Sequence, residues 1–187
     1  MPLVFGLPVI LGPVHIALLE LIIDPVCSLV FEAEREERDV MKRPPRRADA
    51  ALFSWPLIAW SVLQGAMAFA LIAAIFVGAL RSGVASDEAR ALAFIALVVC
   101  VATLVLVNRS FSASFLSAFF RPNPALLWIA VAIASILSAA LLWPRASSLF
   151  RFGPLHPDDL AITLGAGFLL LTVLELLKPI WAGRLRF

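Results

Sequence analysis

Five stretches of mostly apolar residues, separated by shorter polar segments, dominate the pattern along the chain. They cover about residues 14–31, 56–80, 89–108, 124–143 and 159–180. Roughly 20 such residues are needed for a helix to cross the hydrocarbon core of a bilayer. Ser54 before the second stretch, and Asn123 followed by Pro124 before the fourth, are residues typical of helix starts. The pattern predicts an all-α fold, a polytopic membrane helix bundle of about five transmembrane helices.

The composition agrees with lipid as the solvent of this chain. Hydrophobic residues make up 62% of it and charged residues 15%, and the mean hydropathy is +0.99. A soluble domain is closer to half apolar and a quarter charged. The net charge of +2 gives no indication of a nucleic-acid partner. Cys27 and Cys100 lie far apart inside apolar stretches, which predicts no disulfide framework.

Basic residues gather in alternate connections and predict the orientation of the bundle. The loop 32–50, the loop 109–123 and the C-terminal tail hold most of the 15 Lys and Arg residues. The alternate connections hold Arg81, Arg90, Arg145 and Arg151. Because cytoplasmic loops of membrane proteins carry an excess of Lys and Arg, the C-terminus is expected in the cytoplasm. Short loops and an Ala-, Leu- and Arg-rich composition favour a bacterial plasma membrane.

The first twelve residues are apolar but interrupted by proline and glycine. We interpret residues 1–12 as the end of a preceding helix and an extracytoplasmic turn, which would make the chain a truncated one. Residues 13–187 would then form one transmembrane domain, with a strongly charged cytoplasmic loop over residues 32–50.

Two carboxylates interrupt the first apolar stretch. Residues 19–25 read LELIIDP, and Glu20 and Asp24 are spaced so that both lie on one face of a helix. Each costs about 2.5–3.5 kcal/mol at the centre of a membrane helix. Their mutual repulsion must be relieved by a proton or by a bound cation. Acids of this kind are also found as snorkelling or helix-pairing groups.

Pro25 follows the second acid directly. Proline lacks a backbone donor and clashes with the carbonyl four residues earlier, so it is expected to release carbonyl oxygens near Leu21 from the helix. Carboxylate and carbonyl oxygens are the ligands of a hard cation such as Ca²⁺. Interrupted helices with acids at mid-membrane depth are a recurring design of ion sites.

The stretch 13–25, PVHIALLELIIDP, resembles the sixth transmembrane helix of P-type cation-transporting ATPases, in particular calcium and sodium–potassium pumps. In those pumps the helix carries an Asn (or Asp)-x-x-Thr-Asp pattern of ion ligands. The resemblance places Glu20 on the first ligand position and Asp24 on the last. Ile23 falls on the threonine position, so that ligand is missing.

The loop after this stretch strengthens the resemblance. Residues 39–46 read DVMKRPPR and are similar to the Asp-x-Met-x-Arg-Pro-Pro-Arg signature that follows the sixth helix in the family. The signature residues are Asp39, Met41, Arg43, Pro44, Pro45 and Arg46. In the family this loop lies near the phosphorylation domain, which implies a role in coupling that domain to the membrane.

The remainder of the chain resembles the seventh to tenth helices of the family. Residues 120–128 are similar to the beginning of the ninth helix, and residues 174–178 to the end of the tenth. Glu175 and Lys178 there are spaced for an ion pair. The third stretch departs from reticulum-type calcium pumps, because it has no acid in its interior. This departure favours a single ion site and leaves the identity of the ion open.

The resemblance implies the membrane-embedded C-terminal part of an ATP-driven cation pump, with Glu20 and Asp24 as carboxylate ligands of a divalent cation such as Ca²⁺. The chain has no Asp-Lys-Thr-Gly-Thr phosphorylation motif and no nucleotide-binding domain, so we do not expect it to hydrolyse ATP alone. ATP and Mg²⁺ would act only in a complete pump, whose N-terminal helices and cytoplasmic domains would be partners of this chain.

Two other functions remain compatible with the sequence: a small stand-alone membrane protein that regulates or assembles a partner, and an unrelated transporter whose acids carry protons or ions. Gln64, inside the second stretch, is a candidate for a secondary ion ligand through its amide oxygen. Its alternative role is a hydrogen bond between helices.

Overall fold

The computed structural model of the protein describes residues 9–34, 54–109 and 124–185. The helices in these ranges are α1 (Pro13–Glu32), α2 (Trp55–Arg81), α3 (Ser86–Asn108), α5 (Pro124–Leu142), α6 (Pro144–Phe150) and α7 (Pro157–Leu185). Five of them are long and apolar enough to span a membrane. No strand occurs among the described residues, and the predicted all-α bundle is confirmed.

Local sequence signals account for the starts of α2, α3 and α7. At α2 the side chain of Ser54 accepts a hydrogen bond from the backbone N–H of Leu57, as an N-cap residue does. At α3, Asp87 and Glu88 lie in the first turn, where a negative charge is favoured by the helix dipole. At α7, Asp158 and Asp159 do the same. Polar or acidic residues therefore mark the starts of α2, α3 and α7, and at α2 the Ser54 side chain satisfies a free backbone N–H group.

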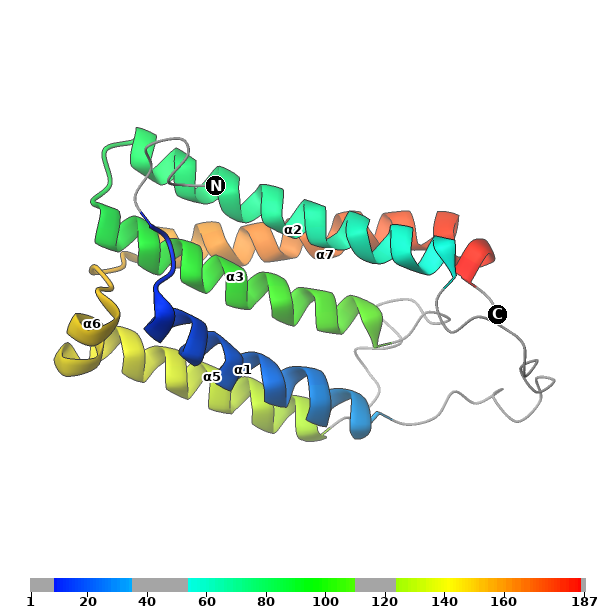
Figure 1. The fold of residues 1–187 in the computed structure, drawn as a ribbon, viewed down its shortest axis with the longest axis horizontal. Helices are drawn as coiled ribbons and strands as arrows, with labels where there is room; N and C mark the ends of the chain where they lie inside the picture. The colour runs from blue at the N-terminus through cyan, green and yellow to red at the C-terminus, as the bar shows by residue number, and fades with distance from the viewer. Residues whose placement is uncertain (1–8, 35–53, 110–123, 186–187) are drawn as a thin grey trace.

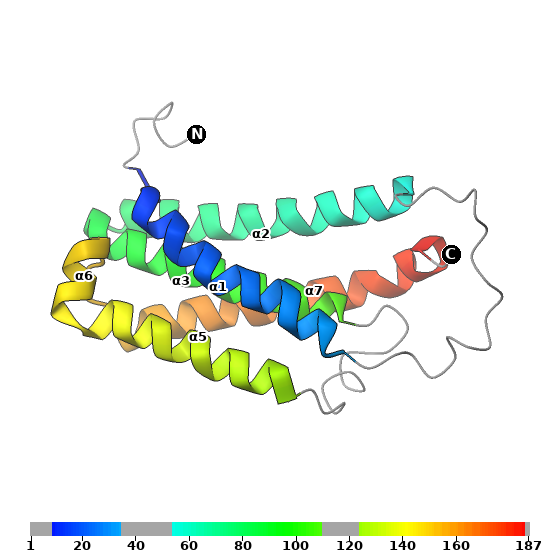
Figure 2. The same ribbon diagram turned by 60° about the horizontal axis from the view of Figure 1, so that its bottom comes forward.

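The helix α3 is the centre of the bundle. It packs against α1, α2 and α7, while α1 also packs against α5. Figure 1 shows α3 between α2 on one side and α1 and α5 on the other, and in Figure 2 α1 crosses in front of α3. Most of the α3 span is buried, whereas the other spans leave most of their apolar surface exposed. An exposed apolar surface of this extent is expected for helices that face lipid.

The packing of α7 against α3 depends on one glycine. Gly167 on α7 is buried, and a Cβ atom added to it would lie 2.3 Å from Cγ1 of Val99 and 3.3 Å from Oγ1 of Thr103. Small residues at such contacts let the backbones of membrane helices approach closely. Gly165, two residues earlier on the same helix, has no such neighbour within 4 Å.

Two features differ from the sequence-based picture. The short helix α6 was not predicted, because its seven residues are too few to show a periodic pattern. The helix α1 is not interrupted at Pro25 but runs through it to Glu32. Residues 9–12 precede α1 without helical structure, while residues 1–8 lie outside the described residues. The interpretation of residues 1–12 therefore stays a prediction.

Candidate functional site

The two predicted ligand acids lie on the exposed face of α1. The helix packs into the bundle through a stripe of His15, Leu18, Ile22, Val26 and Val30. Both Glu20 and Asp24 are exposed. Ile22 lies in the middle of the packed stripe. Each acid is two positions from Ile22 along the chain, and therefore about 160° from it around the helix. The carboxylates therefore point away from α3 and α5, toward a face of α1 that these two neighbours leave open.

The backbone beside Asp24 has unusual hydrogen bonding. Since Pro25 has no N–H, the carbonyl oxygen of Leu21 cannot receive its usual helical hydrogen bond from that residue. One helical turn further on, the hydroxyl of Ser28 donates to the carbonyl oxygen of Asp24 at 2.5 Å. The helix continues through Pro25 to Glu32, so the missing N–H of Pro25 removes one helical hydrogen bond without ending the helix.

The third candidate, Gln64, is engaged elsewhere. It is buried on α2, donates through Nε2 to Oδ1 of Asn108 at 3.1 Å, and accepts from Nδ2 of Asn108 at 3.0 Å. This reciprocal amide pair joins α2 to the last residue of α3. Among the described residues, the hydrogen bonds of the Gln64 amide go to Asn108, and neither Glu20 nor Asp24 is a hydrogen-bond partner. The role of Gln64 as a secondary ligand stays a prediction. Its contacts are those of the alternative role, a hydrogen bond between helices.

The signature residues of the predicted coupling loop, from Asp39 to Arg46, lie outside the described residues. The start of that loop is described and is firmly held. Nε and Nη2 of Arg109 donate to the two carboxylate oxygens of Glu34 at 2.7 and 3.2 Å. The Arg109 side chain is 2% exposed. A two-pronged bond of this geometry orients both partners, so the chain leaving α1 is fixed against the end of α3.

A second basic side chain, that of Lys178, is held close by. Nζ of Lys178 on α7 donates to the carbonyl oxygen of Val107 and to Oε1 of Glu175, both at 3.0 Å. The ion pair between Lys178 and Glu175 confirms the one expected from their spacing. We call this end of the bundle, with Glu34, Asn108, Arg109 and Lys178, the Arg109 end. A cation near the last carbonyls of α3 also complements its helix dipole.

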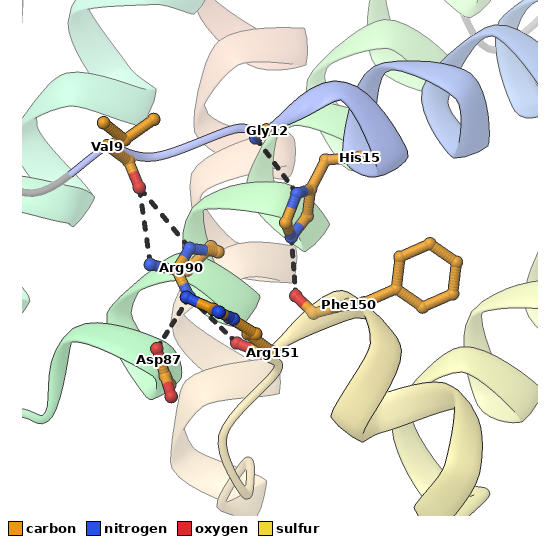
Figure 3. A network of polar contacts seen from close by, with 7 residues as sticks. All are labelled: Val9, Gly12, His15, Asp87, Arg90, Phe150 and Arg151. Atoms are coloured by element: carbon orange, nitrogen blue, oxygen red, sulfur yellow. Dashed lines mark hydrogen bonds and ion pairs between the residues drawn. The ribbon is translucent and has the colours of Figure 1, made fainter.

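The opposite end, which we call the α6 end, is tied by the polar network in Figure 3. Nδ1 of His15 accepts from the backbone N–H of Gly12 at 3.1 Å. Its other ring nitrogen, Nε2, lies 2.6 Å from the carbonyl oxygen of Phe150. Since Nδ1 is an acceptor, Nε2 must carry the proton and donate it to that carbonyl. A neutral, buried imidazole thus joins the start of α1 to the end of α6.

Arg90 organises the rest of this network. Its guanidinium donates to a carboxylate oxygen of Asp87 at 2.6 Å, to the carbonyl oxygen of Arg151 at 3.1 Å and to that of Val9 at 3.4 Å. Arg151 has a positive φ of 48° and ends α6 in a left-handed conformation. One side chain therefore holds the segment before α1, the start of α3 and the connection to α7 together (Figure 3).

Comparison with known protein families decides the identity of this bundle. The family model described as "Cation transporting ATPase, C-terminus" matches residues 8–180. The chain belongs to this family. A comparison with curated proteins gives no match.

Membership in the cation-ATPase family makes the chain the membrane part of a cation pump and an integral, multi-pass membrane protein. The suspected resemblance is thereby confirmed. Within this cation-ATPase domain, sequence reasoning interpreted Arg90 and Arg109 only as markers of orientation. The spacing of Arg90 and Asp87 is that of a helical ion pair, but the other partners of Arg90 and the partner of Arg109 lie 61 to 81 residues away. No local pattern in a single sequence predicts these distant contacts.

Proposed function

We propose that Glu20 and Asp24 supply carboxylate ligands to the ion-translocation site of an ATP-driven P-type pump, and that the transported ion is a divalent cation such as Ca²⁺. The observation that supports this proposal is the position of both acids on the face of α1 opposite its packed stripe. Left against lipid, each would cost about 2.5–3.5 kcal/mol. A cation between them, covered by further helices, removes that cost.

The covering elements in this proposal belong to the same pump. Its N-terminal helices would lie against the acid face of α1, and its cytoplasmic domains would bind ATP and Mg²⁺. The ligand chemistry supports a hard cation, because Glu20, Asp24 and the carbonyl of Leu21 offer only oxygen atoms. Thiolate ligands, which softer metals prefer, are not part of this set.

The coupling role proposed for Asp39, Met41, Arg43, Pro44, Pro45 and Arg46 has a structural counterpart at the start of their loop. Glu34 is the last described residue at the start of this loop, and Arg109 binds it with both prongs of its guanidinium. A force on the loop would therefore reach both α1 and α3. On the predicted orientation, the Arg109 end faces the cytoplasm, where the phosphorylation domain acts.

The test is Ca²⁺-dependent phosphorylation of the complete pump in membrane vesicles, with the variants Glu20→Gln and Asp24→Asn. Each removes one charge and keeps the shape of the side chain. We expect the Ca²⁺ concentration for half-maximal phosphorylation to rise at least about tenfold, since losing even a supporting partner of a metal ligand costs 10–100-fold in affinity. Glu32→Gln, at the exposed end of the same helix, is the matched control.

Three results would reject parts of the proposal. Unchanged Ca²⁺ dependence in both variants would remove the acids from the site. Transport that continues without any divalent cation and follows a proton gradient would favour a proton-carrying transporter. In native membranes, an antibody against residues 32–50 that detects only a band near 20.3 kDa would favour a stand-alone membrane protein. A band several times heavier is the outcome that the proposal expects.

A further inference from the structure

Three metal-ligating side chains meet at the α6 end of the bundle, away from Glu20 and Asp24. They are Glu88 in the first turn of α3, His156 just before α7, and Asp159 in the first turn of α7. One potential ligand atom from each lies within 4.8 Å of the other two. Nδ1 of His156 is 3.2 Å from Oε1 of Glu88 and 3.8 Å from Oδ2 of Asp159.

The two separations from His156 are close to the edges of a metal coordination shell, and the Glu88 and Asp159 oxygens lie within 4.8 Å of each other. Zn²⁺ binds histidine nitrogen and carboxylate oxygen at about 2.0–2.2 Å with tetrahedral geometry, which places two ligand atoms roughly 3.3 Å apart. The separation between His156 and Glu88 matches this value, and that between His156 and Asp159 needs an adjustment of only about 0.5 Å. Three protein ligands and one open position form a shell that water completes.

The backbone around the three ligands is held in place before any ion binds. The N–H of Gly153 donates to the carbonyl oxygen of Asp87 at 3.0 Å. A Cβ atom on Gly153 would lie 2.6 Å from the backbone nitrogen of Glu88, so the connection before α7 rests directly on the start of α3. The N–H of His156 also donates to Oδ2 of Asp159 at 2.9 Å. Ligands that are already ordered lose less conformational entropy when an ion binds.

The charge and exposure of the cluster also suit a cation. The side chains of Glu88 and Asp159 are 19% and 16% exposed, and His156 is 68% exposed, so an ion can reach the ligands from solvent. Among the ion pairs of the described residues, His156 is the partner of both carboxylates, and neither pairs with Lys or Arg. Two partly buried negative charges therefore share one imidazole, which is neutral whenever it serves as a metal ligand.

We propose that Glu88, His156 and Asp159 form a binding site for a divalent transition-metal ion of the Zn²⁺ class, which clasps the start of α3 to the start of α7. The imidazole selects against Ca²⁺ and Mg²⁺, because these ions prefer oxygen ligands. The site is separate from the translocation site, does not depend on the identity of the transported ion, and stabilises the pairing of α3 with α7.

The first test measures Zn²⁺ binding to the complete chain in detergent micelles by competition with a fluorescent chelator. We expect one saturable site per chain. His156→Gln and Glu88→Gln should each weaken binding at least about tenfold, by analogy with the loss of supporting groups around metal sites. Asp158→Asn is the matched control: it removes a neighbouring, exposed carboxylate that is not in the cluster and should leave affinity unchanged.

A second test uses the unaltered chain and does not depend on the folding of variants. The chain contains two histidines, of which His15 is 7% exposed and His156 is accessible. Diethyl pyrocarbonate should therefore modify His156 first, as located by peptide mass spectrometry. Zn²⁺ should protect His156, and Mg²⁺ at the same concentration should not. Absence of saturable Zn²⁺ binding, binding unaffected in both cluster variants, or modification of His156 unaffected by Zn²⁺ would each overturn the proposal.

Discussion

Replacing Gly167 by alanine tests how closely α7 approaches α3. The added Cβ would lie 2.3 Å from Cγ1 of Val99. Valine has essentially one χ1 rotamer in a helix, so its methyl group cannot simply turn away. The two helices must separate, and inserting a methyl group into a packed interior typically costs about 1–3 kcal/mol. Alanine also gains about 1 kcal/mol over glycine in helix propensity.

The matched control is Gly165→Ala on the same helix. Its Cβ would meet no atom within 4 Å, so this variant gains the helix propensity without the clash. Because the propensity gain is common to both variants, their difference reports the clash alone, and we expect Gly167→Ala to be about 2 kcal/mol less stable than Gly165→Ala. The assay is equilibrium unfolding of the chain in mixed micelles with increasing sodium dodecyl sulfate.

A double-mutant cycle tests the contact between the Cβ added at Gly167 and Cγ1 of Val99. Val99→Ala removes Cγ1 and leaves Oγ1 of Thr103 as the nearest remaining neighbour, at 3.3 Å. In that background Gly167→Ala should lose most of its effect, which gives a coupling energy of at least about 0.5 kcal/mol. Equal stability of the two glycine variants, or an unchanged penalty in the Val99→Ala background, would refute a close contact between α3 and α7.

Three further stability changes follow from one close backbone contact and two polar contacts, each measured by the same unfolding assay. Gly153→Ala should lower stability by about 1–3 kcal/mol, because the new Cβ meets the backbone of Glu88. Arg109→Ala should cost about 3 kcal/mol by leaving the partly buried Glu34 carboxylate without its guanidinium, and Arg109→Lys should restore only part of it. Gln64→Leu should cost about 1–2 kcal/mol, since its amide partner on α3 keeps one hydrogen bond within its own helix.

The long helices could be predicted from the sequence because each carries its own signal. A run of about 20 apolar residues, with Ser54 or Asp87 at its start, indicates a span without reference to any other part of the chain. The short helix α6 has no such signal. Its conformation depends on contacts made by its end, where the carbonyls of Phe150 and Arg151 accept hydrogen bonds from His15 and Arg90.

The candidate site could also be predicted only in part from the sequence. Glu20 and Asp24 stand out because carboxylates are costly in an apolar helix, and their spacing predicts a shared face. The direction of that face could not be predicted, since it depends on which stripe of α1 packs against α3 and α5. The cluster of Glu88 and His156 was missed for a related reason: its members are 68 residues apart, and folding alone brings them together.

The polar contacts at the two ends of α1 have a mechanical consequence. His15 fastens the start of the helix to α6, and Glu34 fastens the chain just beyond its end to α3. A rod clamped at both ends yields most readily between the clamps. In α1 that middle region contains Glu20 and Asp24 together with Pro25, whose missing N–H removes one of the bonds that would resist bending. Strain reaching this helix from the Arg109 end would be taken up as curvature at the acids, while both ends stay in place.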